Sequence, residues 1–302
     1  MSTETVPHAA MGPRTAYLLA ATSMIIYSSP PVVTRAVSLG VPPLALSLAR
    51  WVIAFVILLP WVRGRLREEW PKLKAQLPSI LFMVTFMIVG STFSVVAVYY
   101  TTATNAVLVN AAQPTTTALL AWLIAGTRLT SGQRIGIVCA FVGIVVMVAR
   151  ADLSVLLALE LNIGDLFMLL AVLGWSAYAV LLSRREYAPD GVVLMLIIAA
   201  TGSVLLLPAY AIEAAFVGPF TLTAEVGAAM VYLAVFPTLL ATFGWTLAVR
   251  AIGPNRAAIF VNLIPVSGAV LAMVFLGERL FAYHFVGAAF VAAGIYFAIR
   301  GR

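Results

Sequence analysis

The chain has 302 residues, of which 63% are hydrophobic and 10% are charged, with a formal net charge of +7. A soluble domain carries about 25% charged residues, so this chain lacks the polar side chains that a water-facing surface needs. The composition predicts an integral membrane protein. The apolar runs are continuous, whereas the strands of a membrane barrel alternate over about ten residues, so a barrel is excluded. The basic residues sit in short loops, where orientation in a membrane explains them without nucleic acid.

Ten apolar segments follow one another along the chain, each close to the ~20 residues that cross a bilayer as a helix. They are residues 15–34, 43–62, 79–101, 103–126, 132–148, 164–182, 192–212, 226–249, 256–276 and 280–299. Residues 1–14 form a tail before them. The longest connections are the basic segment 63–77 and the segment 150–163, which we interpret as the seam between two halves. The sequence therefore predicts an all-α integral membrane protein with ten transmembrane helices.

Lys and Arg residues are distributed unequally between the two sides of these segments. Fourteen of the eighteen fall on one side and three on the other, while Arg50 lies within the second segment. Because cytoplasmic loops carry an excess of positive charge, we expect both termini to be cytoplasmic. The expected location is the cell inner (plasma) membrane, as a multi-pass protein.

The sequence repeats itself with a shift of 151 positions. The matching residues include Ala97 with Ala248, Pro114 with Pro265, Gly126 with Gly277, Arg128 with Arg279, Gly136 with Gly287 and Gly143 with Gly294. We therefore expect a first five-helix repeat at 15–149, an inter-repeat loop at 150–163 and a second five-helix repeat at 164–302. Because five is an odd number, the repeats are predicted to be inverted in the membrane. Inverted repeats are common in secondary transporters, with the substrate site near the midplane where the repeats meet.

The repeated residues also carry a family resemblance. They comprise Ala97-Val98-Tyr99-Tyr100, Ala248-Val249-Arg250, Gly277-Glu278-Arg279, Asn110, Pro114, Pro265 and the paired glycines. This set resembles the EamA-type branch of the drug/metabolite transporter superfamily. The first half departs from the family's Gly-Glu-Arg turn, with Gly126-Thr127-Arg128. The resemblance implies a central cavity formed by segments one, three, four, six, eight and nine, with five and ten peripheral. Among relatives, the aromatic amino-acid exporters are the most similar in function.

Polar and aromatic side chains recur at helical spacing in the proposed cavity segments, so that they share one face of each helix. An unsatisfied polar group in hydrocarbon costs several kcal/mol, so these faces turn toward other helices or toward a wet cavity. The alternative to a cavity is hydrogen bonding between helices, at ~0.6 kcal/mol each. We expect the substrate cavity to be lined by Tyr27, Tyr99, Asn110, Gln113, Trp175, Tyr178, Thr242, Trp245 and Asn262. Tyr99 also fits an interfacial aromatic belt.

Four prolines lie inside the predicted cavity helices: Pro30, Pro114, Pro237 and Pro265. Each removes a backbone donor from its helix. We interpret them as hinges or gates for alternating access, with static kinks as the alternative.

The positions of the charged residues bear on coupling. All eleven acidic residues fall in the tail, in loops or at segment ends. Proton-coupled carriers usually need an intramembrane carboxylate or His, and His284 is a candidate only in the peripheral tenth segment. This pattern favours facilitated diffusion. Arg50 could meet a substrate carboxylate or cap helix carbonyls; because the resemblance places the second segment outside the cavity, we favour the structural role.

The sequence has no Gly-rich phosphate loop, no paired carboxylates and no His cluster, and Cys139 has no partner base. We therefore expect no enzyme activity, no cofactor and no metal site. The leading hypothesis is a secondary transporter that exports small metabolites, most of all amino acids including aromatic ones. The expected partners are a small-molecule substrate and the lipid bilayer, with the chain a monomer or homodimer. The alternatives are a proton-coupled drug/metabolite exporter, an intramembrane enzyme or a channel.

Overall fold

The computed structural model describes residues 12–37, 40–101, 103–149, 162–184, 189–218, 220–276 and 281–300, with single residues at 152, 154 and 157. All regular secondary structure in these residues is helical. The predicted Gly277-Glu278-Arg279 turn and most of the segment 150–163 lie outside the described residues.

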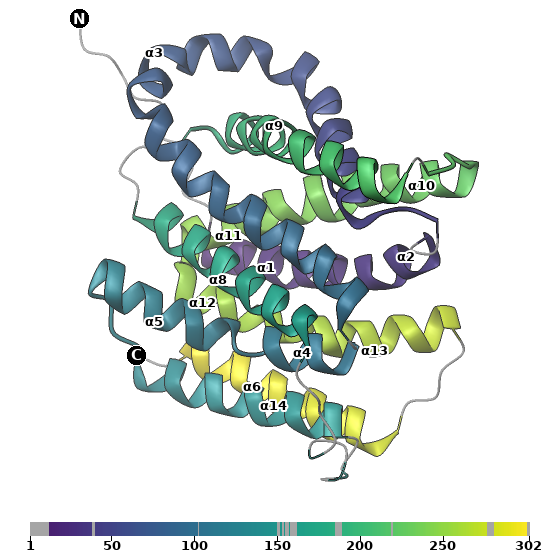
Figure 1. Ribbon diagram of the computed structural model, residues 1–302. Coiled ribbons are helices and arrows are strands. Elements are labelled where there is room, and N and C mark those ends of the chain that lie inside the picture. Colours follow the sequence, from purple (N-terminus) through teal and green to yellow (C-terminus); the bar gives the residue numbers. More distant parts are fainter. Residues whose placement is uncertain are drawn as a thin grey trace, which may run out of the picture.

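The helices pack against one another in a bundle (Figure 1). Their bounds are α1 Pro13–Tyr27, α2 Pro30–Val37, α3 Pro43–Tyr100, α4 Ala103–Asn110, α5 Gln113–Ala125, α6 Ser131–Ala149, α8 Ile163–Ser183, α9 Gly191–Val217, α10 Ala224–Leu233, η1 Ala234–Ala241, α11 Thr242–Ile252, α12 Pro254–Ile259, η2 Phe260–Asn262, α13 Leu263–Leu276 and α14 Ala282–Arg300. Of these, η1 is a π-helix and η2 a 3₁₀ turn.

Seven helical runs in the described residues are long and apolar enough to cross a membrane. The difference from the ten predicted segments has two causes. Segments 15–34 and 256–276 are broken into shorter helices, and segments 43–62 and 79–101 are joined in one helix. The chain is thus a multi-pass helical protein, and the count of ten crossings stays a prediction.

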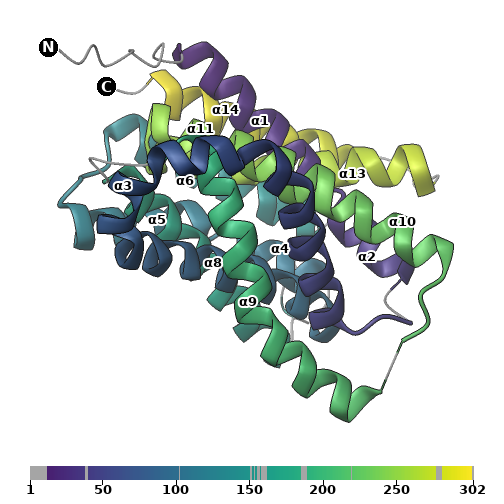
Figure 2. The same cartoon turned by 90° about the horizontal axis from the view of Figure 1, so that it is seen from above.

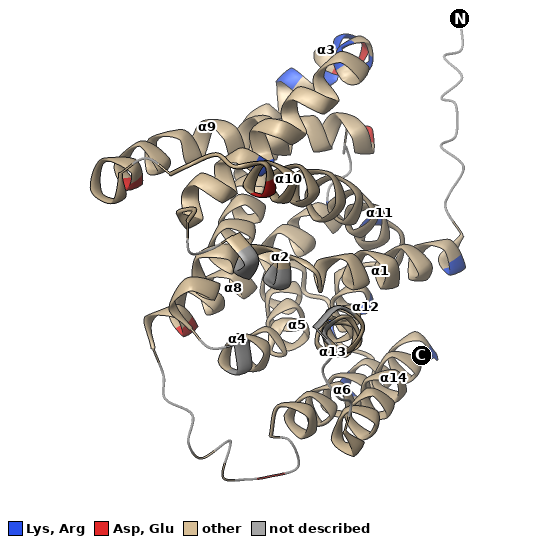
Figure 3. Cartoon of the chain, turned by 90° about the vertical axis from the view of Figure 1, so that its right-hand side faces the viewer, with Lys and Arg blue, Asp and Glu red and all other residues tan. Residues whose placement is uncertain are grey.

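The joined helix, α3, corrects the predicted loop at 63–77. It runs for 58 residues, about 87 Å at 1.5 Å per residue, and Figure 1 shows it as an arch with two limbs. The connecting residues are rich in Arg, Glu, Leu and Lys, which have high helix propensity, and Val62 and Leu73 are buried in the core. The basic composition of residues 63–77 therefore does not indicate a loop. It suits a helix that emerges from the bilayer. Lys and Arg residues gather on this arch (Figure 3).

The predicted peripheral helices α6 and α14 pack along each other at one edge of the bundle (Figure 1). A Cβ added at Gly136 would lie 2.6 Å from the Gly294 carbonyl oxygen, and one added at Gly143 would lie 2.6 Å from that of Gly287. Only glycine permits such a close approach. Because Gly136, the earlier of these two α6 glycines, meets Gly294, the later of the two α14 glycines, the two helices are antiparallel.

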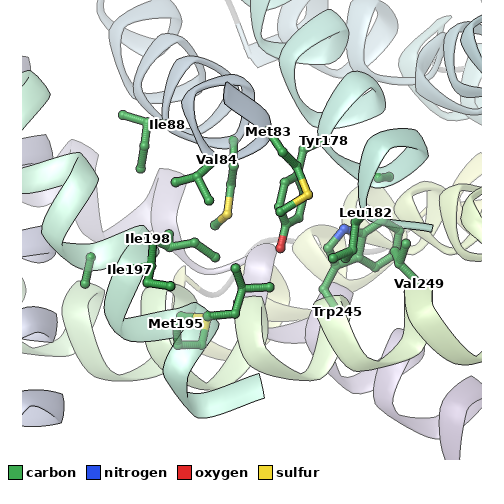
Figure 4. Packing of buried hydrophobic residues seen from close by; sticks show 14 of the residues in the cluster. Met83, Val84, Ile88, Tyr178, Leu182, Met195, Ile197, Ile198, Trp245 and Val249 are labelled. Carbon is green, nitrogen blue, oxygen red and sulfur yellow. The ribbon is translucent and has the colours of Figure 1, made fainter. Parts of the chain in front are cut away.

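The main core lies where α3, α8, α9 and α11 meet. Met83, Tyr178, Met195 and Trp245, one from each of these helices, are at most 2% exposed and form part of one apolar cluster (Figure 4). The N-terminal end of α1 and the C-terminal end of α14 lie at the same end of the bundle (Figure 2).

Candidate functional site

Each of the four predicted gating prolines lies within or just after an interruption of the α-helix. α1 ends at Tyr27 before Pro30, α4 ends at Asn110 before Pro114, α10 gives way to the π-helix before Pro237, and α12 gives way to the 3₁₀ turn before Pro265. Proline cannot donate to the carbonyl four residues earlier, and its ring clashes with that carbonyl. The sequence therefore explains where these helices break.

The backbone at the first of these breaks is stabilised by nearby hydroxyl groups. Ser28 and Ser29 donate to the carbonyl oxygens of Ile25 and Ile26 at 2.6 and 2.8 Å. The Tyr232 hydroxyl donates to Ser29 Oγ at 2.8 Å, which connects α10 to the break. Irregular backbone at membrane depth is tolerated only where protein or water satisfies it, and here protein does so.

Three of the predicted cavity residues, Tyr27, Trp175 and Thr242, come together beside this break. The Tyr27 hydroxyl lies 2.6 Å from Thr242 Oγ1. The Tyr27 and Trp175 rings meet edge to face, with centroids 5.8 Å apart. The group joins α1 to α8 and α11, so it bridges the two halves of the chain. We name these three residues the aromatic cluster.

Tyr178 and Trp245 are more deeply buried. Tyr178 is fully buried, and its hydroxyl lies 3.0 Å from Thr246 Oγ1 on α11. Trp245 is 1% exposed, and its indole nitrogen has no hydrogen-bond partner among the described residues. Tyr178 follows Tyr27 by the repeat shift of 151 positions, so both halves place a tyrosine hydroxyl against a threonine of α11.

Asn110 and Asn262 line one small cavity, between α4 and the broken helix α12–α13. Its volume is about 10 Å³, and Val261 and Pro265 form part of its wall. That space is about the size of a single water probe. Asn262 is 1% exposed, and its Oδ1 has no hydrogen-bond partner among the described residues. Burying an amide oxygen without a hydrogen-bond partner costs free energy. The position of this oxygen at a cavity wall therefore makes Asn262 a candidate site residue.

The remaining two predicted residues are not part of these groups. Gln113 is buried at the first position of α5. Tyr99 donates to the Val41 carbonyl oxygen at 3.0 Å, about 12 Å along α3 from Ser91. It connects the end of α3 to the loop before that helix, and the structure does not bring it to the aromatic cluster.

Arg50, for which the sequence favours a structural role over a place in the cavity, bonds to the backbone of its own helix. Its Nη2 donates to the carbonyl oxygen and the Oγ of Ser91 at 2.9 and 2.7 Å, between the two limbs of α3. The side chain is 7% exposed, and a Cβ added at Gly90, next to Ser91, would lie 2.9 Å from Trp175 Cδ1. The sequence signal for this residue is a single charge within an apolar run.

A larger groove of about 620 Å³ lies between α3, α8 and α9. Its wall is mostly apolar, including Ile88, Phe93, Phe167 and Leu205, and none of the nine predicted residues lines it. Such a wall matches the hydrocarbon of a bilayer better than it matches a polar solute.

Asp165 is a buried carboxylate at the start of α8. Its oxygens accept hydrogen bonds from the Thr101 hydroxyl, from Asn105 Nδ2 at 2.9 Å and from the Asn162 backbone N–H at 2.9 Å. With Asn162 it forms a capping box, a pattern visible in the sequence as Asn-x-x-Asp. It therefore anchors α3 and α4 to α8. His284, by contrast, accepts from the Phe281 N–H through Nδ1 at the start of the peripheral α14.

Apolar helices broken by prolines around a few buried polar groups are typical of helical membrane transporters. The profile of the EamA-like transporter family matches residues 14–149 and again residues 162–300. The chain belongs to this family.

Similar proteins agree with this assignment. An uncharacterized transporter of Archaeoglobus fulgidus is 27% identical over 288 residues, which cover 93% of this chain and 96% of that protein. The uncharacterized transporter YetK of Bacillus subtilis is 24% identical over 287 residues, covering 94% and 86%. A protein of known crystal structure shares the fold, with a TM-score of 0.75 at 18% identity, covering 94% of this chain and 96% of the other.

Proposed function

We propose that this transporter is a secondary carrier that works by alternating access and exports small metabolites, most of all amino acids including aromatic ones. The observation that carries the proposal is the meeting of proline-broken helices from both halves around the aromatic cluster and the Asn110–Asn262 cavity. Broken helices that meet at a repeat interface are typical of transporter binding sites.

The glycine contacts of α6 and α14 support the inverted arrangement of the repeats. By the shift of 151 positions, Gly136 corresponds to Gly287 and Gly143 to Gly294. In space, Gly136 meets Gly294, and Gly143 meets Gly287. Each glycine thus contacts the counterpart of the other one, which is the pattern that a two-fold axis produces. We propose that such an axis relates two inverted five-helix repeats, with both termini on the cytoplasmic side of the inner membrane.

The closed centre fits one state of an alternating-access cycle. The nine proposed cavity residues are Tyr27, Tyr99, Asn110, Gln113, Trp175, Tyr178, Thr242, Trp245 and Asn262. Two of them, Asn110 and Asn262, line a cavity of about 10 Å³, which is far smaller than an amino acid. We interpret the structure as a closed state that opens by movement at Pro30, Pro114, Pro237 and Pro265. The rings of Tyr27 and Trp175 would then receive a planar side chain.

The buried charges favour facilitated diffusion over proton exchange. Among the described residues, the buried ionisable side chains are Arg50 and Asp165. Asp165 accepts three hydrogen bonds and caps a helix, which suits a permanently ionised structural carboxylate. Proton coupling through Asp165 is the second candidate mechanism, because a buried carboxylate is the group such coupling requires.

Uptake into proteoliposomes tests the transport mode. The purified protein is reconstituted, and entry of labelled phenylalanine is measured with and without a pH gradient. We expect saturable entry that a pH gradient changes by less than two-fold. Strong stimulation by the gradient, lost in Asp165→Asn, would replace facilitated diffusion by proton exchange. Linear entry without saturation would indicate a channel.

A further inference from the structure

Arg50 is a buried cation without an anionic partner in the described part of the chain. No Asp or Glu side chain there forms an ion pair with it. Its Nε has no hydrogen-bond partner among the described residues, and Nη2 binds only the neutral oxygens of Ser91. Arg250 also has an Nε without a hydrogen-bond partner among the described residues, but it is only partly buried, and its Nη2 donates to the Pro189 carbonyl oxygen, next to Asp190 at the start of α9.

An arginine in this situation is energetically unfavourable. The guanidinium stays charged in proteins, so it cannot escape the cost of burial by releasing a proton. Two neutral acceptors compensate only part of the lost hydration, and intramembrane charges of this kind usually mark a substrate pathway. The structural role, joining the limbs of α3 through Ser91, uses one nitrogen, and the guanidinium carbon lies 5.5 Å from the Trp51 ring centroid. Nε still has no hydrogen-bond partner among the described residues.

The surroundings of Arg50 identify what would satisfy it. Arg50 bonds to Ser91, and the neighbouring Gly90 packs against Trp175, where an added Cβ would lie 2.9 Å from Cδ1. Trp175 contacts Tyr27, which contacts Thr242. Arg50 is therefore adjacent to the aromatic cluster at the meeting point of the two halves. Among the described residues no second Lys or Arg is buried. One cation beside two aromatic rings suits a ligand with a single anionic group and an apolar body, rather than a polyphosphate.

We propose that Arg50 is the anion-recognising residue of the transport site and that the substrates carry one carboxylate. A carboxylate oxygen accepts strong, charge-assisted N–H bonds from a guanidinium, and the Nε–H of Arg50 is a buried donor without a partner among the described residues. This inference rests on the proposed function, that the chain carries small metabolites through the aromatic cluster. It assigns Arg50, which the resemblance placed outside the cavity, to substrate specificity.

Matched pairs of ligands test the inference on the purified full-length protein. The probes are L-phenylalanine with L-phenylalaninamide, and L-leucine with L-leucinamide, so that each pair differs only in the carboxylate. Binding is measured by calorimetric titration. We expect each acid to bind the wild-type protein at least ten-fold more tightly than its amide. In Arg50→Gln this preference falls to within two-fold, and in Arg50→Lys it is intermediate.

The control is Arg134→Gln. Arg134 is exposed and bonds only to Ser131 Oγ at 3.0 Å, so this variant keeps the wild-type preference. A purely structural Arg50 would lower thermal stability but leave the acid-to-amide ratio unchanged. If Arg50→Gln does not fold, the inference is tested by the acid-to-amide affinity ratios of the wild-type protein and of Arg50→Lys.

The outcomes separate this inference from the proposed function. If acids and amides bind equally, or if the protein exchanges only compounds without an acidic group, the carboxylate role of Arg50 is wrong and the carrier stands. If no small molecule binds or exchanges, both proposals fail.

Discussion

The Tyr27 hydroxyl lies 2.6 Å from Thr242 Oγ1 and joins a helix of the first half to a helix of the second. Tyr27 is the last residue of α1, before the break at Pro30, and Thr242 is the first residue of α11, after the π-helix that contains Pro237. Both ends of this hydrogen bond are therefore attached to interrupted helices. Such a contact can form in a closed state and separate when one half moves.

Tyr27→Phe removes this hydrogen bond and keeps the ring. We expect the free energy of unfolding to fall by about 1 kcal/mol, the usual contribution of a buried hydrogen bond, because the closed state loses one contact. Transport of phenylalanine should change in maximal rate rather than disappear. Thermal unfolding and proteoliposome uptake measure the two effects. Tyr296→Phe is the control, since Tyr296 is half exposed on peripheral α14; equal effects of both variants would remove the special role of Tyr27.

Asn262→Leu separates stability from transport. Asn262 buries an amide oxygen without a partner among the described residues, so an apolar side chain of similar size should leave stability equal or higher. Transport should fall at least ten-fold if the amide faces the substrate path. Asn255→Leu is the control, because Asn255 also has an unpartnered Oδ1 but does not line the Asn110–Asn262 cavity. Normal uptake by Asn262→Leu would remove this cavity from the proposed path.

Gly136→Ala tests the close packing of α6 against α14. The added methyl group would meet the Gly294 carbonyl oxygen at 2.6 Å, so the helices must separate, at ~1–3 kcal/mol. Gly227→Ala is the control, since nothing lies within 4 Å of a Cβ there. Thermal unfolding in detergent compares them. Equal melting temperatures would contradict the glycine contact on which the two-fold argument rests.

Asp165→Ala tests the anchor between α3, α4 and α8. The substitution leaves the donors of Thr101, Asn105 and Asn162 without their shared acceptor. We expect a loss of ~1–3 kcal/mol in unfolding free energy, with substrate affinity unchanged in the folded fraction. Asp152→Ala, whose carboxylate accepts from Ser154 alone among the residues that the structure describes, should leave stability unchanged. A fully stable Asp165→Ala would exclude the anchoring role.

The apolar segments were predictable because spans of ~20 residues have few alternatives in a bilayer. The helix breaks were also predictable, since Pro114 and Pro265 act on the turn that precedes them. The continuous α3 was not, because helical residues in a basic segment resemble a loop when only hydropathy is considered. The arrangement of the site was harder to predict than the helices. The contact of Arg50 with Ser91 spans 41 positions, and no local pattern predicts which buried polar residues meet.

Counterflow of labelled substrate tests the central claim, that the two halves alternate around a closed site. Proteoliposomes are loaded with unlabelled phenylalanine and diluted into a trace of labelled phenylalanine, with wild-type protein and with Tyr27→Phe. The account predicts transient accumulation of label above equilibrium, with a changed rate in the variant. Entry of label that only approaches equilibrium and does not depend on the internal phenylalanine would contradict a carrier and indicate a pore.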